Sequence, residues 1–288
     1  MTGWQRSWRG WGSALGLVAG ALVAAGLLFA RPAVAGLQPS RGGLLRPGAQ
    51  APTRVVVLVI ANGGKFVGDD IGGALVTLRD ARTGEVLASG RTHGGSGLPN
   101  LPTIEATRLQ EIPEEEAARF ETTLALEEPR LVEVIADGPL AAQAGAARAT
   151  TTTWLLPAGS APDANRVVLS LRGLLVQVLA PPTHFLPTTP APLPVSLRAN
   201  VTMMCGCPIG PNFPWHPDDY EVQATIQDPD GVRHVVPLTF DADAPDHAPS
   251  QFVGSWVAPT AGIYEVVVTA HQPVHDNTGS DRVTFIVP

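Results

Sequence analysis

The chain has little cysteine and almost no lysine. Cys205 and Cys207 are its only cysteines, and Lys65 is its only lysine. Cysteines two positions apart cannot cross-link distant elements, which excludes the disulfide framework that stabilises many small secreted domains. The fold must therefore rely on the burial of apolar side chains. With a net charge of −7 and no basic stripe to neutralise phosphates, the chain is not expected to bind nucleic acid.

Motifs of the common catalytic classes are also absent from the sequence. There is no Gly-x-Ser-x-Gly elbow, no glycine-rich phosphate loop and no His-Glu-x-x-His zinc motif. His93 and the glycines after it superficially resemble an oxyanion loop. They follow a predicted β-hairpin, however, and not a strand of an α/β sheet. We therefore expect that the protein is not an enzyme.

Only one apolar run is long enough to suggest targeting. Residues 14–30 are small and apolar, they follow two arginines, and residues 33–35 read Ala-Val-Ala. This three-part pattern predicts a signal peptide over residues 1–35, cut after Ala35. The alternative is an uncleaved anchor, because seventeen apolar residues lie at the lower limit for crossing roughly 30 Å of hydrocarbon. The membrane is then a partner only through residues 14–30.

The composition places the exported chain in a bacterium. Alanine, glycine and proline are abundant, and arginine far outnumbers lysine, which is typical of a GC-rich genome. Cleavage would leave 253 of the 288 residues, and the loss of three arginines would take the net charge from −7 to −10. We expect a periplasmic or secreted protein, large enough for one or two buried cores.

Strand patterns dominate the first half of the mature chain. Residues 36–53 are rich in Gly, Pro and Arg and predict a flexible lead. A first domain over 54–180 begins with the apolar run 54–60, which is typical of a strand buried on both faces. Two short runs around Thr83-Gly84 predict a β-hairpin. Pro113 and three following glutamates predict one short helix. Further strands are expected at these ranges: 120–126, 131–136, 150–156 and 167–179, the last broken at Gly173.

A proline-dense stretch separates the two halves. Residues 181–194 contain six prolines, which lack the backbone donor that an internal strand needs, and predict an interdomain linker. The second domain, 195–288, alternates between apolar and polar residues from Val195 to Cys205 and again around Tyr220 and Tyr264. Six or seven such strands, with a hairpin turn at 228–231, predict an antiparallel sandwich. The predicted fold class is all-β, with two tandem antiparallel β-sandwich domains and one short helix in the first.

Two segments resemble known β-modules. Residues 73–92, with the pattern Gly-Ala-x-Val-x-Leu-x-Asp followed by Thr-Gly, resemble carboxypeptidase-regulatory-like or transthyretin-like modules. Residues 261–268, together with Asn277-Thr278-Gly279, resemble the last strands of bacterial immunoglobulin-like domains. That resemblance implies that the hydroxyl of Tyr264 bonds back to the backbone. The first resemblance implies binding, anchoring or structural support. The second says almost nothing about function, because the immunoglobulin-like sandwich hosts many unrelated roles.

One segment of the second domain concentrates soft metal ligands. Met203, Met204, Cys205 and Cys207 lie within five positions, and His216 follows in a loop rich in proline and glycine. Thiolate and thioether sulfur select Cu(I), so these five residues form a candidate copper site.

Two other interpretations of the segment stay open. Met203 and Cys205 lie on the apolar face of the strand pattern, where Met and Cys are ordinary core residues. Cys207 continues that face unless the chain turns at Gly206. Alternatively, the two cysteines form a disulfide, structural or redox-active.

Three hypotheses follow for the role of the chain. The first is an exported, non-enzymatic binding or structural protein that contacts a protein or envelope partner. The second is a periplasmic copper-binding or metallochaperone-type accessory protein that uses the five residues of the candidate site. The third is a thiol-disulfide active protein that uses Cys205 and Cys207.

Overall fold

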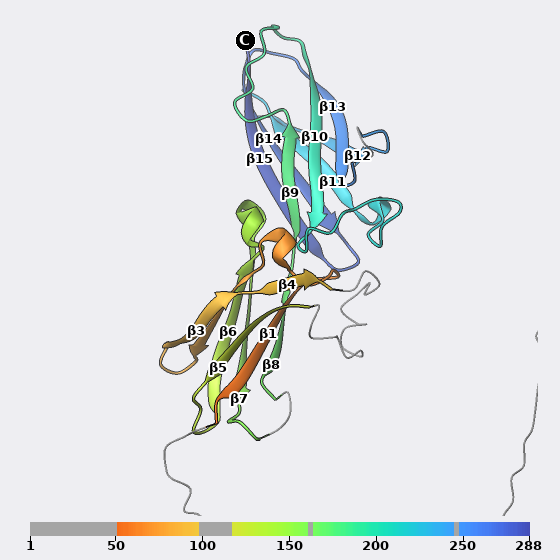
Figure 1. Cartoon of the computed structure of the whole chain (residues 1–288). Coiled ribbons are helices and arrows are strands. Elements are labelled where there is room, and N and C mark those ends of the chain that lie inside the picture. Colours follow the sequence, from red (N-terminus) through yellow and green to blue (C-terminus); the bar gives the residue numbers. More distant parts are fainter. Residues whose placement is uncertain (1–50, 98–116, 161–163, 245–247) are drawn as a thin grey trace, which may run out of the picture. The chain divides into compact units, whose positions relative to one another are not determined.

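The structure, a computed structural model, describes residues 51–97, 117–160, 164–244 and 248–288 (Figure 1). In this part the chain is all-β, and the longest helical segment is the 3-10 turn η2 (Leu140–Gly145). None of its helical segments has the length and apolarity that a membrane crossing requires. The predicted signal peptide, nearly all of the predicted lead, and the helix predicted after Pro113 lie outside the described residues.

The apolar run near the start forms the centre of a four-stranded sheet with the order β4-β5-β1-β8. Its strands are β1 (Thr53–Ala61), β4 (His93–Ser96), β5 (Ala117–Leu124) and β8 (Arg166–Leu171). Eight of the nine residues of β1 are buried, as a strand covered on both faces requires. β1 pairs antiparallel with β5 but parallel with β8. The prediction of purely antiparallel sheets is therefore wrong at this pair, because a chain pattern does not encode which strand becomes a neighbour.

The predicted hairpin lies in a second four-stranded sheet with the order β3-β2-β6-β7. Its strands are β2 (Leu75–Asp80), β3 (Val86–Arg91), β6 (Arg130–Gly138) and β7 (Ala147–Leu155). β2 and β3 pair antiparallel, which confirms the hairpin. Alternate residues of the two four-stranded sheets, such as Val57 and Val134, belong to one buried apolar cluster. Burial of that cluster holds the two sheets together.

The second half forms a seven-stranded antiparallel sheet with the order β15-β14-β11-β12-β13-β10-β9. Its strands are β9 (Leu174–Ala180), β10 (Leu193–Met203), β11 (Glu221–Gln227), β12 (Arg233–Phe240), β13 (Gln251–Ala258), β14 (Gly262–Gln272) and β15 (Asn277–Val287). Buried residues alternate along β10, as predicted. The edge strands β9 and β15 meet where the Val178 amide donates to the Asp281 carboxylate at 2.7 Å. The sheet is thus nearly closed and barrel-like.

The proline-dense stretch does not have the role that the sequence predicted. The sequence predicts that the first domain extends to residue 180, but β9 is hydrogen-bonded to β10 in the seven-stranded sheet. Residues 181–194 therefore join two neighbouring strands of one sheet, and the interdomain linker is corrected to a connection within it. The chain passes from the β8 sheet to the seven-stranded sheet earlier, at Gly173, where φ is +137°. The predicted break at Gly173 is confirmed.

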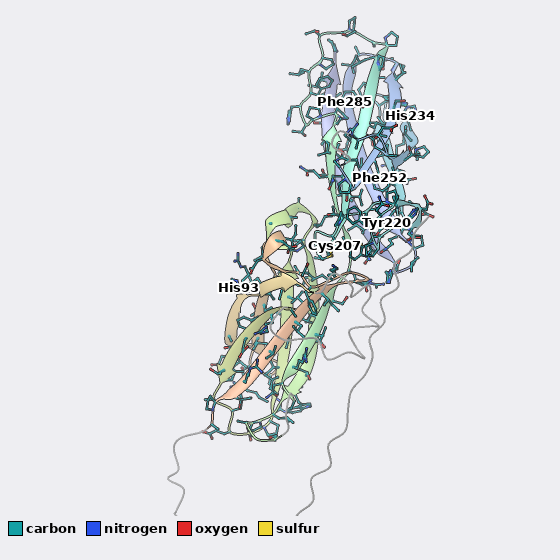
Figure 2. All side chains as sticks on the ribbon, turned by 45° about the vertical axis from the view of Figure 1, so that its right-hand side comes forward. His93, Cys207, Tyr220, His234, Phe252 and Phe285 are labelled. Atoms are coloured by element: carbon teal, nitrogen blue, oxygen red, sulfur yellow. A yellow bond between two sulfur atoms is a disulfide. The ribbon has the colours of Figure 1, made fainter. Side chains whose placement is uncertain are left out.

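Tyr264 makes the bond that its sequence context implied. Its hydroxyl donates to the Thr260 carbonyl at 2.8 Å, and its fully buried ring stacks on Phe285 (labelled in Figure 2) at 5.0 Å between centroids. The contact fixes the entry to β14 against the core of the seven-stranded sheet.

Candidate functional site

The segment rich in soft ligands forms a tight turn at the end of β10. The chain reverses at Gly206, whose φ of +71° is a left-handed conformation that glycine adopts without steric cost. The Gly206 amide donates to the Met203 carbonyl at 2.8 Å, and the Met203 amide donates to the Cys207 carbonyl at 3.2 Å. This is a three-residue hairpin loop with glycine at the left-handed position. Cys205 and Cys207 form a disulfide across it, and both are buried.

The five residues of the predicted copper site have different environments. Cys205 and Met203 lie together, because a Cβ at Gly64 would be 3.2 Å from the Cys205 Sγ and 3.5 Å from the Met203 Cε. Met204 is also buried, and it packs against Gly173.

His216 does not share that environment. It is about half exposed, and its Nδ1 accepts the Asp218 amide at 3.3 Å. This contact caps the short helix η3 (Pro217–Asp219).

Disulfide formation removes two of the five predicted metal ligands. Cysteine binds a metal as the thiolate, and the sulfur atoms of Cys205 and Cys207 are instead bonded to each other. The described residues contain no group of three or more His, Cys, Asp or Glu side chains that could hold a metal ion. The copper site therefore stays a prediction that concerns the reduced chain.

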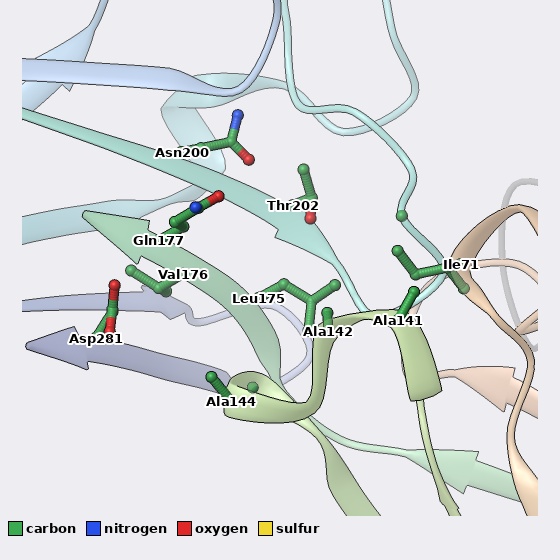
Figure 3. Close-up of a pocket in the computed structure, with 12 residues that line it drawn as sticks. Ile71, Ala141, Ala142, Ala144, Leu175, Val176, Gln177, Asn200, Thr202 and Asp281 are labelled. Carbon is green, nitrogen blue, oxygen red and sulfur yellow. The ribbon is translucent and has the colours of Figure 1, made fainter. Parts of the chain in front are cut away.

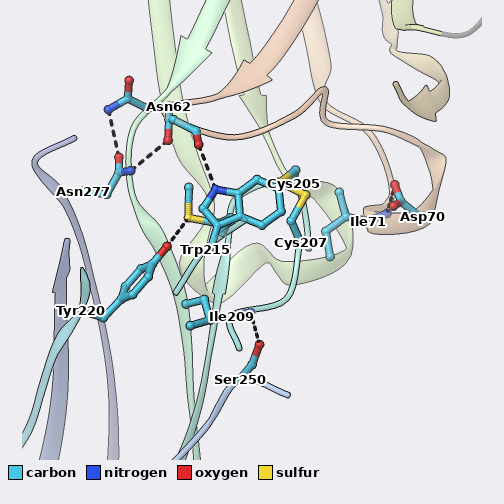
Figure 4. Close-up of a disulfide and its surroundings, with 12 residues drawn as sticks. Asn62, Asp70, Ile71, Cys205, Cys207, Ile209, Trp215, Tyr220, Ser250 and Asn277 are labelled. Atoms are coloured by element: carbon cyan, nitrogen blue, oxygen red, sulfur yellow. Dashed lines mark hydrogen bonds between the residues drawn. A yellow bond between two sulfur atoms is a disulfide. The ribbon is translucent and has the colours of Figure 1, made fainter. Parts of the chain in front are cut away.

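Tyr220 and Trp215 connect the turn to its surroundings (Figure 4). The Tyr220 hydroxyl donates to the Met203 Sδ at 3.1 Å, and burial, with a smaller contribution from Asp219, raises the pKa of Tyr220 well above its usual range. Trp215 is 5% exposed, and its Nε1 donates to the Gly63 carbonyl at 3.0 Å. The indole thereby ties the loop after β10 to the loop after β1.

A fully satisfied amide, Asn277, lies at the centre of this region. Its side chain is completely buried. Its Nδ2 donates to the Asn62 carbonyl at 2.9 Å and to the Gln272 Oε1 at 2.8 Å. Its Oδ1 accepts from the Gly173 amide and from the Asn62 Nδ2, both at 3.1 Å. Gln272 in turn donates to the Tyr220 hydroxyl at 3.0 Å. The bonds form one chain from the β1 loop to the disulfide turn.

We call this connected set the joint. It consists of Asn62, Met203, Cys205, Cys207, Trp215, Tyr220, Gln272 and Asn277. A buried polar network of this kind is costly unless every member is paired, and when paired it fixes one arrangement of the elements that contribute to it. Residues 48–288 accordingly form one compact unit. The sequence offered no signal for the amides of the joint, because Asn62 and Asn277 are 215 positions apart.

A cleft of about 580 Å³ adjoins the disulfide turn (Figure 3). Its apolar lining comes mainly from η2 and β9, and its polar lining from β9, β10 and β15. The lining residues are Ile71, Ala141, Ala142, Ala144, Gly145, Leu175, Val176, Gln177, Asn200, Thr202, Gly206 and Asp281. Gly206 thus belongs both to the turn and to the wall of the cleft.

Comparison with known proteins gives a distant likeness of fold. No protein-family model matches the chain, and no curated protein matches it. Among solved structures, the fibronectin(III)-like modules of Clostridium thermocellum CbhA are similar to it, with 14% identity over 82% of this chain and 94% of theirs. The TM-score is 0.26, so the likeness carries no argument about the site.

Proposed function

We propose that the protein is an exported, non-enzymatic binding or structural protein of the bacterial envelope. In this proposal its all-β fold combines two packed four-stranded sheets with an immunoglobulin-like part built on the seven-stranded sheet. The observation that carries the proposal is the joint: three of the four soft-ligand sulfurs after residue 35, the thioether of Met203 and both cysteine sulfurs, are engaged in buried structural contacts.

The joint suits a protein that presents surfaces at a fixed geometry. Asn277 donates to the Asn62 carbonyl and Trp215 to the Gly63 carbonyl, so the loop after β1 is held by at least two contacts from different parts of the chain. Sheets held in this way offer faces and loops to a protein or envelope partner without a conformational step. A structural role also accounts for a disulfide that is buried and not exposed to a redox partner.

Three measurements test the proposal: intact mass, cell fractionation and thiol labelling. The intact mass should correspond to a chain that begins at Gly36, and the protein should be found in the periplasmic or extracellular fraction. Thiol labelling of freshly isolated protein should find Cys205 and Cys207 blocked until the protein is reduced under denaturing conditions. A chain that retains residues 1–35 in the cytosol contradicts export. A pair that cycles under native conditions with a physiological thiol favours the thiol-disulfide hypothesis instead.

A copper-binding role is the second candidate, and one contact favours it. Reduction of the disulfide would release two thiols near the thioether of Met203, because the side chains of Cys205 and Met203 both lie against Gly64. Such a set would bind Cu(I) through soft sulfur ligands. The protein purified without oxygen should be titrated with Cu(I) against a competing chelator, alongside Cys205→Ser and Cys207→Ser. Binding below one equivalent that neither substitution changes would eliminate this candidate.

A further inference from the structure

The cleft beside the joint has a floor of polar and apolar side chains and one wall of aliphatic side chains. Its floor is formed by cross-strand neighbours of β9 and β10, in which Gln177 lies opposite Asn200 and Leu175 lies opposite Thr202. Figure 3 shows the alanines of η2 along one side and Ile71 near the disulfide turn. The volume of about 580 Å³ lies within the range of ligand sites in proteins.

Three polar side chains of the floor are available to a ligand. Gln177, Asn200 and Thr202 line the cleft, and none of them makes a side-chain hydrogen bond to another residue that the structure describes. An amide side chain offers two donors and an acceptor, and a hydroxyl offers one donor and an acceptor. These groups match the donors and acceptors of a peptide backbone.

The charge and shape of the lining narrow the class of ligand. Asp281 is the only charged residue among those that line the cleft, and backbone amides hold both of its carboxylate oxygens at 2.7 Å. With no Lys, Arg or His in that lining, an anionic ligand would meet only negative charge. With no aromatic ring in it, a sugar or nucleobase would find no face for stacking.

We propose that the cleft binds an extended segment of a partner protein. The segment carries small aliphatic side chains against the η2 alanines and a cationic group at the end near Asp281. Its backbone bonds to Gln177 and Asn200. The inference rests on the proposed binding role and specifies the chemistry of the partner.

Titration with two blocked peptides tests the inference on the exported chain. The probes are Ac-Ala-Val-Ala-Lys-NH2 and the same peptide with glutamate in place of lysine, followed by amide NMR shifts up to 10 mM peptide. The lysine peptide should shift resonances of β9, β10 and η2, and it should bind roughly threefold to fivefold more tightly than the glutamate peptide, as expected for one exposed ion pair.

Two tryptophan substitutions separate the cleft from the surrounding surface. Ala144→Trp places an indole in the cleft and should weaken binding of the lysine peptide at least about tenfold, because the indole occupies the space of the ligand. Ala146→Trp is the matched control, since Ala146 is exposed and does not line the cleft. Equal affinity in the two variants, equal affinity of the two peptides, or no shift at 10 mM would overturn the inference. Export and an oxidised turn would then still support the proposed function.

Discussion

Replacement of Asn277 by alanine tests whether the joint holds the molecule together. The substitution removes four hydrogen bonds from a completely buried position. The Asn62 Nδ2 keeps a second partner, the His275 carbonyl at 2.8 Å. Three groups lose their bonds to the Asn277 side chain: the Gly173 amide, the Asn62 carbonyl and the Gln272 Oε1.

The cost follows from these three groups. A buried polar group left without a partner costs about 1–3 kcal/mol. Partial relaxation and entry of water reduce the sum, so we expect Asn277→Ala to lower the free energy of unfolding by about 3–5 kcal/mol. For a chain of this size, about 2–4 °C per kcal/mol predicts a fall in the melting temperature of roughly 6–20 °C.

Urea unfolding of the chain without residues 1–35 gives the assay. Fluorescence follows the three tryptophans outside the predicted signal peptide, one of which, Trp215, lies in the joint. Thr278→Ala is the matched control, because Thr278 is the exposed neighbour of Asn277 and its loss should change stability by no more than about 0.5 kcal/mol. A loss below about 1 kcal/mol in Asn277→Ala would refute the reasoning, since the network would then not constrain the fold.

Three further substitutions have expected outcomes in the same assay. Gly206→Ala should cost about 1 kcal/mol more than Gly231→Ala: both glycines have positive φ, but only at Gly206 would a Cβ approach a neighbour, at 3.3 Å. Tyr264→Phe should cost about 1–2 kcal/mol, because a buried ring loses its bond to the backbone. Asp80→Asn tests pH dependence. A hydrogen bond from Arg130 is the main cause that lowers the pKa of Asp80 below its usual 3.8, so its contribution to stability is present above about pH 4 and declines at lower pH. The urea midpoint of Asp80→Asn should therefore fall less than that of the unchanged chain between pH 7 and pH 3; equal losses would contradict the assignment.

Local patterns in the sequence predicted the strands well. The alternation along residues 195–203 matches β10, and the turn at 228–231 joins β11 to β12. Both depend on residues near one another in the chain, where pleat and turn chemistry decide the outcome. Strand partners depend instead on distant contacts, so the parallel pairing of β1 with β8 and the place of β9 were not predictable. The sequence places Pro194 in a linker, but the residue lies near the start of β10, opposite Val257. A proline is tolerated at such a position, and the strand pairing that allows it is again a distant contact.

The candidate site was predictable only where its residues are close in sequence. The clustering of Met203, Cys205 and Cys207 identified the turn and left a disulfide as one of its open interpretations. Asn62 precedes two glycines, a pattern typical of a strand end, and neither it nor Gln272 has a sequence context that indicates a buried network. A buried amide network is assembled by topology from residues that carry no local pattern, so the sequence indicated the sulfur-rich turn and not the amides that lie beside it.

The disulfide turn and the Asn277 network contribute unequally to the stability of the joint. A disulfide that closes a loop of three residues restricts the unfolded chain little and contributes roughly 1.5 kcal/mol in the chain-entropy account. Gly206 and two backbone hydrogen bonds also hold the turn. The Asn277 network, by contrast, ties together segments more than 200 residues apart. The arrangement of the β1 loop against the seven-stranded sheet therefore depends mainly on the amides, and reduction of Cys205 and Cys207 should lower the free energy of unfolding by less than Asn277→Ala does.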